Sequence, residues 1–70
     1  MSKQRFTDYY LSAMIRAATG GSVQRVRYSY LDLAKLEQAI IIYDNGYTKT
    51  VDVTGDSLVG IAYDVLKAVM

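Results

Sequence analysis

Four residue types are missing from this chain: cysteine, histidine, proline and tryptophan. Without cysteine no disulfide can staple the fold, and without cysteine and histidine most structural zinc sites have no ligands. The same two absences exclude a cysteine nucleophile and a serine–histidine pair. Proline is absent while 51% of the residues are apolar, a composition typical of a chain that folds and not of a disordered tail.

The chain also lacks a long apolar run. Its longest strongly apolar, uncharged stretch covers about residues 58–63, far short of the roughly 20 residues that span a bilayer. The basic N-terminus, with Lys3 and Arg5, runs directly into the polar residues Thr7 and Asp8, so no apolar signal-peptide core follows it. We therefore expect no membrane span and, by default, a cytoplasmic location.

What is present is a single small domain, which we expect to cover residues 1–70. At this length one core supplies only a few kcal/mol of net stability, and disulfides, metals or association with other chains usually add the rest. Because the first two are excluded, self-association or an unusually apolar core is the remaining route. The profile is also typical of small accessory proteins of phages and mobile elements, an impression that rests on composition alone.

The charge is unevenly distributed, although its total is only +1. Residues 1–35 hold six basic and two acidic side chains, a net +4, and residues 36–70 hold two basic and five acidic ones, a net −3. The simplest interpretation is that the two oppositely charged halves attract each other within one fold. The alternative is that the basic half forms a surface that binds a partner.

Two segments have helical spacing. Residues 3–19 carry a wide apolar stripe, with Ser2 placed to cap the start of the helix and Gly20 to end it. The stripe comprises Phe6, Tyr10, Ala13, Met14 and Ala17, widened by Leu11, Ile15 and Ala18. The second helix follows Asp56 or Ser57 as its cap, and its stripe comprises Leu58, Ile61, Ala62, Val65, Leu66 and Val69. Gly60 costs this helix about 1 kcal/mol relative to alanine, which hints at a close contact there, and a glycine tolerated at the surface is the equally common alternative.

Three segments between the helices predict strands. Residues 22–31 alternate, with Val26, Tyr28 and Tyr30 on one face and Arg25, Arg27 and Ser29 on the other. Residues 32–37 are ambiguous, either a short helical turn capped by Asp32 or a loose connection. Residues 38–43 and 47–54 flank Asn45–Gly46, the strongest short signal for a hairpin.

A two-residue loop at Asn45–Gly46 sets the register of that hairpin, so that Ile41 faces Thr50 and Ile42 faces Lys49. A three-residue loop with a bulge would mix apolar and threonine positions on both faces, and we therefore favour the two-residue register. We expect the helices to contact Ile40, Ile42, Val51 and Val53. The opposite face of the sheet, with Ile41 and Tyr43, is expected to be exposed to solvent.

The order helix, strand, strand, strand, helix predicts an α+β fold. Specifically, we expect a small two-layer domain with a three-stranded antiparallel sheet and both helices on one face. This packing covers the apolar stripes of the two helices with one face of the sheet.

No residue pattern indicates catalysis or a cofactor. The four aspartates of the second half that are available for acid–base work have ordinary explanations as a turn residue, a cap and solvent-facing side chains: Asp44, Asp56, Asp52 and Asp64. The segments 19–22 and 54–57 do not form a phosphate cradle, because one has the reverse element order and the other places Asp56 where a phosphate would sit. We predict no enzyme activity, no cofactor, no metal and no small-molecule ligand.

The predicted open face of the sheet is the candidate binding surface. Its partner-binding residues would be Arg25, Arg27, Ile41, Tyr43 and Tyr63. The first hypothesis is a protein-interaction module that binds a protein partner or a second copy, as a homodimer, through this face or a sheet edge. The alternative is nucleic-acid binding by the basic side chains, with Tyr43 stacking on bases; these are Lys3, Arg5, Arg16, Arg25 and Arg27. A small enzyme or ligand carrier is the third, disfavoured hypothesis.

Overall fold

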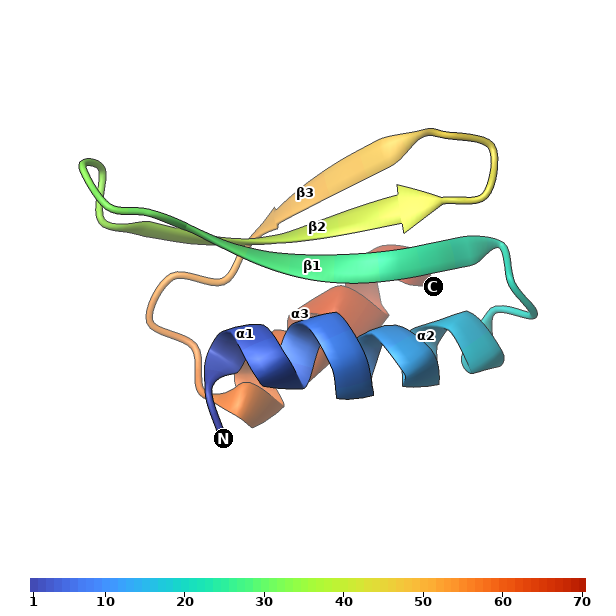
Figure 1. Cartoon of the computed structure of the whole chain (residues 1–70), viewed down its shortest axis with the longest axis horizontal. Coiled ribbons are helices and arrows are strands. Elements are labelled where there is room, and N and C mark those ends of the chain that lie inside the picture. The colour runs from blue at the N-terminus through green and yellow to red at the C-terminus, as the bar shows by residue number, and fades with distance from the viewer.

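The computed structural model describes residues 1–70 and shows a three-stranded antiparallel sheet with a helical segment before it and another after it (Figure 1). The predicted α+β fold and its order of elements are confirmed. The elements are α1 (Lys3–Arg5), the π-helical segment η1 (Phe6–Leu11), α2 (Ser12–Ala18), β1 (Val23–Leu31), β2 (Leu36–Tyr43), β3 (Thr48–Asp52) and α3 (Leu58–Val69). α1, η1 and α2 run on from one another as one N-terminal helix (Figure 1).

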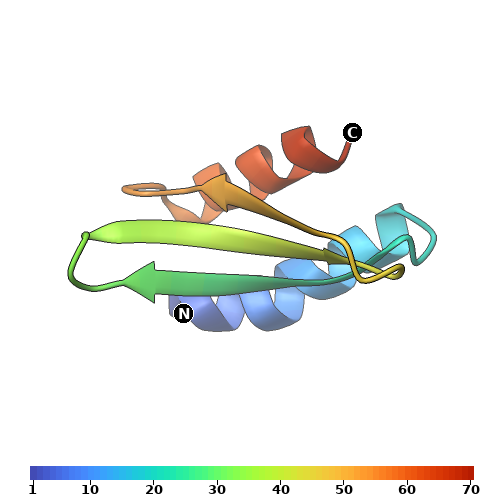
Figure 2. The ribbon, with the colours of Figure 1, turned by 90° about the horizontal axis from the view of Figure 1, so that it is seen from above.

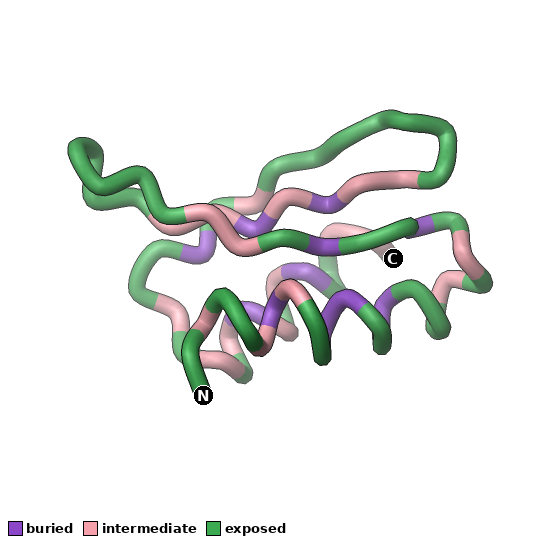
Figure 3. Tube along the Cα trace, in the orientation of Figure 1, coloured by how far each residue is buried: buried purple, intermediate pink, exposed green.

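Both helical segments lie on the same face of the sheet (Figure 2). The N-terminal helix packs against β1, and α3 packs against β2, β3 and η1. Between the layers lies one cluster of nine buried apolar residues, which are Leu11, Ile15, Val23, Val26, Ala39, Ile41, Val53, Ile61 and Val65. Figure 3 shows these buried positions along the facing sides of the two layers. The other face of the sheet has no layer over it.

The N-terminal helix begins and ends as its sequence predicts. Ser2 Oγ accepts the Arg5 N–H at 3.0 Å, which satisfies one of the free amides of the first turn. At the other end Gly20 has a φ of 63°, the left-handed conformation that ends many helices.

The side that this helix buries differs from the predicted stripe. Thr7, Leu11 and Ile15 are 0–1% exposed, whereas Tyr10 and Met14 of the predicted stripe are 50% and 55% exposed. The prediction assumed a regular helix, but η1 is π-helical. Its i to i+5 hydrogen bonds widen the turn, so residues four positions apart, Thr7, Leu11 and Ile15, lie on one side and meet the sheet.

The ambiguous residues 32–37 form a turn and the start of β2. Leu31 pairs with Leu36, and the four residues between them make the loop of the β1–β2 hairpin. Lys35 adopts a φ of 56° there. The tip of this hairpin projects beyond the helices (Figure 1), and Leu33 at the tip is fully exposed.

The β2–β3 hairpin has a three-residue loop, and the predicted two-residue loop is wrong. The Tyr43 N–H donates to Tyr47 O at 2.8 Å, and the Gly46 N–H donates to Tyr43 O at 3.0 Å. Gly46 has a φ of 89°, and a glycine in this conformation closes the three-residue loops that begin with a type I turn. The loop is therefore residues 44–46.

The longer loop shifts every pair by one residue and exchanges the two faces of β2. Ile41 now faces Lys49, and Ile42 faces Thr48. Ile41 is fully buried in the core, and Ile40 lies with Ile42 on the open face. The prediction that Ile40 and Ile42 meet the helices is therefore wrong, because a shift of one residue turns every side chain of a strand to its other face.

In α3 the cap is confirmed and the predicted stripe is too wide. Ser57 Oγ accepts the Gly60 N–H at 3.2 Å. Ile61 and Val65 are fully buried, but Leu66, which was predicted to join them, is 39% exposed. None of the helices has the combination of length and apolarity that crossing a bilayer requires.

Candidate interaction surfaces

The fold separates the five residues predicted to bind a partner. Arg25 and Arg27 are exposed on β1, on the open face of the sheet, as expected. Ile41 is 0% exposed, so the prediction that it faces solvent is wrong. Tyr43 is half-buried and packs against the core, so the prediction that it lies on the open face is also wrong. Tyr63 is exposed on α3, in the other layer of the molecule. Both corrections follow from the shifted register of β2.

The open face consists of three rows of side chains that cross all three strands and a fourth row on β1 and β2 alone. The complete rows are Arg25–Ile42–Thr48, Arg27–Ile40–Thr50 and Ser29–Gln38–Asp52, and the fourth row is Leu31–Leu36. Its apolar members are the half-buried Ile40 and Ile42 and the exposed Leu31 and Leu36, and it carries no aromatic ring. This face is therefore mostly polar, and it offers no platform on which bases could stack.

The two edges of the sheet differ in their protection. On β1 the Val26 N–H donates to Ser12 Oγ at 2.9 Å, and the Tyr28 N–H donates to Asp8 Oδ1 at 2.8 Å. The N-terminal helix thus occupies amides that would otherwise be open to another strand. On β3 no side chain accepts a hydrogen bond from a backbone amide. What limits pairing of this edge with another strand is its length of only five residues. Sequence reasoning missed this role, although two short polar side chains in the middle of an apolar helix were a signal for it.

A shallow groove of about 730 Å³ lies between the N-terminal helix and the start of β1. Arg16 from α2 and Arg25 from β1 both line it, together with Asp8. The Asp8 carboxylate already accepts the Tyr28 N–H, and neither arginine forms an ion pair within the chain. The groove therefore brings together two of the basic residues that the nucleic-acid hypothesis invoked.

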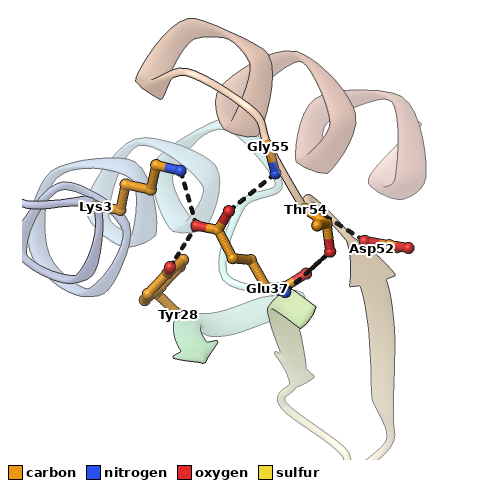
Figure 4. A network of polar contacts seen from close by, with 6 residues as sticks. All are labelled: Lys3, Tyr28, Glu37, Asp52, Thr54 and Gly55. Atoms are coloured by element: carbon orange, nitrogen blue, oxygen red, sulfur yellow. Dashed lines mark hydrogen bonds and ion pairs between the residues drawn. The ribbon is translucent and has the colours of Figure 1, made fainter. Parts of the chain in front are cut away.

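The most connected polar site is centred on Glu37, close to the start of β2 (Figure 4). Its carboxylate accepts hydrogen bonds from Lys3 Nζ at 2.8 Å, from the Tyr28 hydroxyl and from the Gly55 N–H at 2.9 Å. Its own backbone N–H donates to Thr54 Oγ1 at 2.9 Å. A single residue therefore joins the N-terminal helix, β1, β2 and the loop that precedes α3.

These contacts keep Glu37 ionised. Hydrogen bonds from Lys3, Tyr28 and Gly55, in that order, lower the pKa of Glu37 to about 2. Burial first, and then the bond to Glu37 and its charge, raise the pKa of Tyr28 to about 12. A carboxylate with so low a pKa is a weak proton acceptor, so the geometry suits a structural anchor better than acid–base chemistry. Sequence reasoning missed this site, because 34 positions separate Lys3 from Glu37.

A pair of acidic residues lies at the start of α3. A Cβ on Gly60 would lie 3.2 Å from Cβ and Cγ of Asp56, which confirms the close contact expected at this glycine. Hydrogen bonding with Asp64, then burial and the charge of Asp64, raise the pKa of Asp56. The chain supplies no cation in an ion pair with either of them, and no group of three metal-ligating side chains forms. The pair leaves excess negative charge beside α3.

Exposed apolar side chains gather at three places on the structure, and Met1 and Tyr47 are exposed apart from them. The N-terminal helix exposes Tyr9, Tyr10 and Met14, and the tip of the β1–β2 hairpin exposes Tyr30, Leu31, Leu33 and Leu36. The third place, which we call the α3 stripe, consists of Val59, Tyr63, Leu66 and Met70, exposed by 78%, 62%, 39% and 96%. Val59, Tyr63 and Leu66 lie on a single side of α3, opposite to the buried Ile61 and Val65, and Met70 directly follows the helix as its C-cap residue.

Comparison of this chain with protein-family models, with curated proteins and with solved structures finds no match.

Proposed function

We propose that this chain is a non-catalytic protein-interaction module, and that it binds its partner through the α3 stripe. The observation that carries the proposal is that α3 is apolar on two opposite sides. Ile61 and Val65 enter the core, while the α3 stripe points away from it. A helix on the surface of a monomer is ordinarily polar on the side opposite its core stripe. Contiguous exposed apolar side chains of this kind mark interaction sites.

The open face of the sheet supports a weaker version of the same function. In the rows that cross all three strands its apolar side chains, Ile40 and Ile42, are already half-buried, and every other position is charged or polar. The exposed Leu31 and Leu36 lie apart from these rows, next to the tip of the β1–β2 hairpin. Covering this face would desolvate Arg25 and Arg27 without an acidic partner in the chain. The α3 stripe carries no such cost.

The absence of a catalytic role is part of the proposal. Glu37 is held ionised by three donors. The Asp56–Asp64 pair has no nearby histidine, cysteine or third acidic ligand with which to form a reactive or metal-binding group. Cofactors play no part in the proposed function, and a cytoplasmic location stays a prediction.

A double variant, Tyr63→Ser with Leu66→Ser, tests the proposed surface. Both side chains are exposed, so the fold is expected to survive, as circular dichroism would check. Immobilised wild-type chain and variant are compared for the proteins that each retains from an extract of the native host. We expect the variant to lose partners that the wild type retains. The control is Tyr47→Ser, because Tyr47 is as exposed as Tyr63, at 62%, but lies outside α3. Equal retention by the double variant would contradict the proposal.

A second candidate function is nucleic-acid binding, favoured by the groove that Arg16 and Arg25 share, with Arg27 two residues further along β1. In this version the arginines contact phosphates without base stacking, because the open face has no aromatic ring. Arg25→Glu with Arg27→Glu would then abolish a salt-dependent shift of a labelled oligonucleotide. If the double variant still shifts the oligonucleotide, or if the wild type never does, this candidate is wrong.

A further inference from the structure

The spacing of the α3 stripe is that of a coiled-coil seam. Val59, Tyr63, Leu66 and Met70 are separated by four, three and four positions, which is the alternation of the a and d positions of a heptad. Such a seam packs best against another helix with the same spacing. Resting on the proposed function, we propose that the partner is a second copy of this chain, and that the two α3 helices pair in antiparallel orientation.

Antiparallel pairing matches unlike side chains along the seam. With the two-fold axis passing midway between Tyr63 and Leu66, Tyr63 of each copy packs against Leu66 of the other, and Val59 packs against Met70. Large and smaller side chains then alternate across the interface. The dipoles of the two antiparallel helices point in opposite directions and attract each other, whereas those of a parallel pair repel.

The charges beside the seam select the same orientation. Gly60 and Lys67 each follow a d position of the seam and flank it directly. Asp64 follows the a position Tyr63, so it lies on the same side of the helix but further round, toward the core. In the antiparallel pair this flank meets its own copy in reverse, and Lys67 comes level with the segment between Gly60 and Asp64 of the second copy. A parallel pair would instead place this flank of the two copies on opposite sides of the seam, so that Lys67 of one copy would not meet Asp64 of the other.

Both charges are available for this contact. Lys67 has no ion pair within the chain, and its Nζ lies only over the ring of Tyr63, 5.2 Å from the ring centre. Asp64 adjoins Asp56, and this acidic pair has no cation in an ion pair with it. Lys67 of a second copy supplies the counter-charge that each chain lacks.

The interface is small, which determines the concentration range of the experiment. One pair of 12-residue helices buries less than the roughly 1,200–2,000 Å² of stable complexes. We therefore expect a dimer that forms between micromolar and millimolar concentration, and sedimentation equilibrium across that range would detect it.

A charge exchange tests the pairing and its orientation together. Lys67→Glu and Asp64→Lys each place like charges across the interface, and we expect each variant alone to dimerise about tenfold more weakly than the wild type. In a one-to-one mixture of the two variants both charge pairs are opposite again. The mixture is therefore expected to form heterodimers with close to wild-type affinity. Loss of folding in one variant does not imitate this recovery.

The control exchange is Lys35→Glu with Asp32→Lys in the β1–β2 turn, which should leave dimerisation unchanged. If the wild type sediments as a monomer throughout the range, self-pairing is overturned. The proposed function is then judged separately, by whether Tyr63→Ser with Leu66→Ser loses proteins other than this chain. If the wild type dimerises but the mixture shows no recovery, the antiparallel α3 interface is overturned.

Discussion

Lys3 Nζ lies 2.8 Å from Glu37 Oε2 and forms the single ion pair of the structure. The pair connects the first turn of the N-terminal helix to β2, and Glu37 also holds Tyr28 and Gly55. In a domain without disulfides, this carboxylate joins more elements of the fold than any other side chain. Its removal should therefore affect the whole fold and not only one loop.

Glu37→Gln is expected to lower the thermal midpoint of unfolding. The amide keeps the size of the side chain, but it loses the charge that attracts Lys3 and offers one acceptor oxygen where the carboxylate offers two. Differential scanning calorimetry would measure the change. Asp32→Asn in the exposed β1–β2 turn is the matched control, since it removes a carboxylate that makes no side-chain hydrogen bond or ion pair. A midpoint as high as that of the control would contradict the anchoring role.

The same carboxylate predicts how stability depends on pH. The folded-state pKa of Glu37, about 2, lies below its ordinary value of 4.5, so the unfolded chain binds the proton first. The stabilisation is therefore complete above about pH 4.5 and is lost as the pH falls toward 2. The pKa of Asp52 is lowered too, by its hydrogen bonds with Thr54, and contributes in the same direction. Urea unfolding between pH 6 and pH 2 should show a shallower decline in Glu37→Gln than in the wild type. If the stability of the wild type and of Glu37→Gln fell equally with pH, the contribution of the Glu37 carboxylate would be contradicted.

Ser12→Ala is expected to destabilise the fold by about 1–3 kcal/mol, because it leaves the Val26 N–H without an acceptor at a site where Ser12 is only 8% exposed. It also opens the edge of β1 to other strands, and we expect aggregation on heating. Chemical denaturation and light scattering measure the two effects. Ser29→Ala serves as the control, since the Ser29 hydroxyl bonds to no protein group. Equal stability of Ser12→Ala and Ser29→Ala would show that the hydrogen bond from the Val26 N–H to Ser12 does not stabilise the fold.

Two neighbouring isoleucines test the register of β2. Ile41→Ala should cost about 2–5 kcal/mol of unfolding free energy, the usual range for deleting a fully buried branched side chain. Ile42→Ala should cost about 1 kcal/mol, because Ile42 lies half-buried on the open face. Urea titrations of both variants compare the two costs. A larger loss of stability in Ile42→Ala than in Ile41→Ala would show that the two-residue loop is right and that Ile42 faces the core.

The N-terminal helix shows why a helix can be predicted correctly while the side that it buries is predicted wrongly. Apolar side chains lie around most of its circumference, so their pattern favours no single side. Contact with β1 selects the side, since Asp8 and Ser12 must reach the amides of Tyr28 and Val26. Those partners lie 14 and 20 positions away in the sequence, and no local pattern points to them.

The sequence by itself determined the number, type and order of the elements, both helix caps and the exposure of Arg25 and Arg27, because these depend on local periodicity and on neighbouring residues. Only the tertiary structure decided which face of β2 is buried. Three consecutive isoleucines, residues 40–42, leave either face apolar, and Asn45–Gly46 fits a loop of two residues or of three. Packing of the helices against Ala39 and Ile41 selects one register, and with it the surface that is left for a partner.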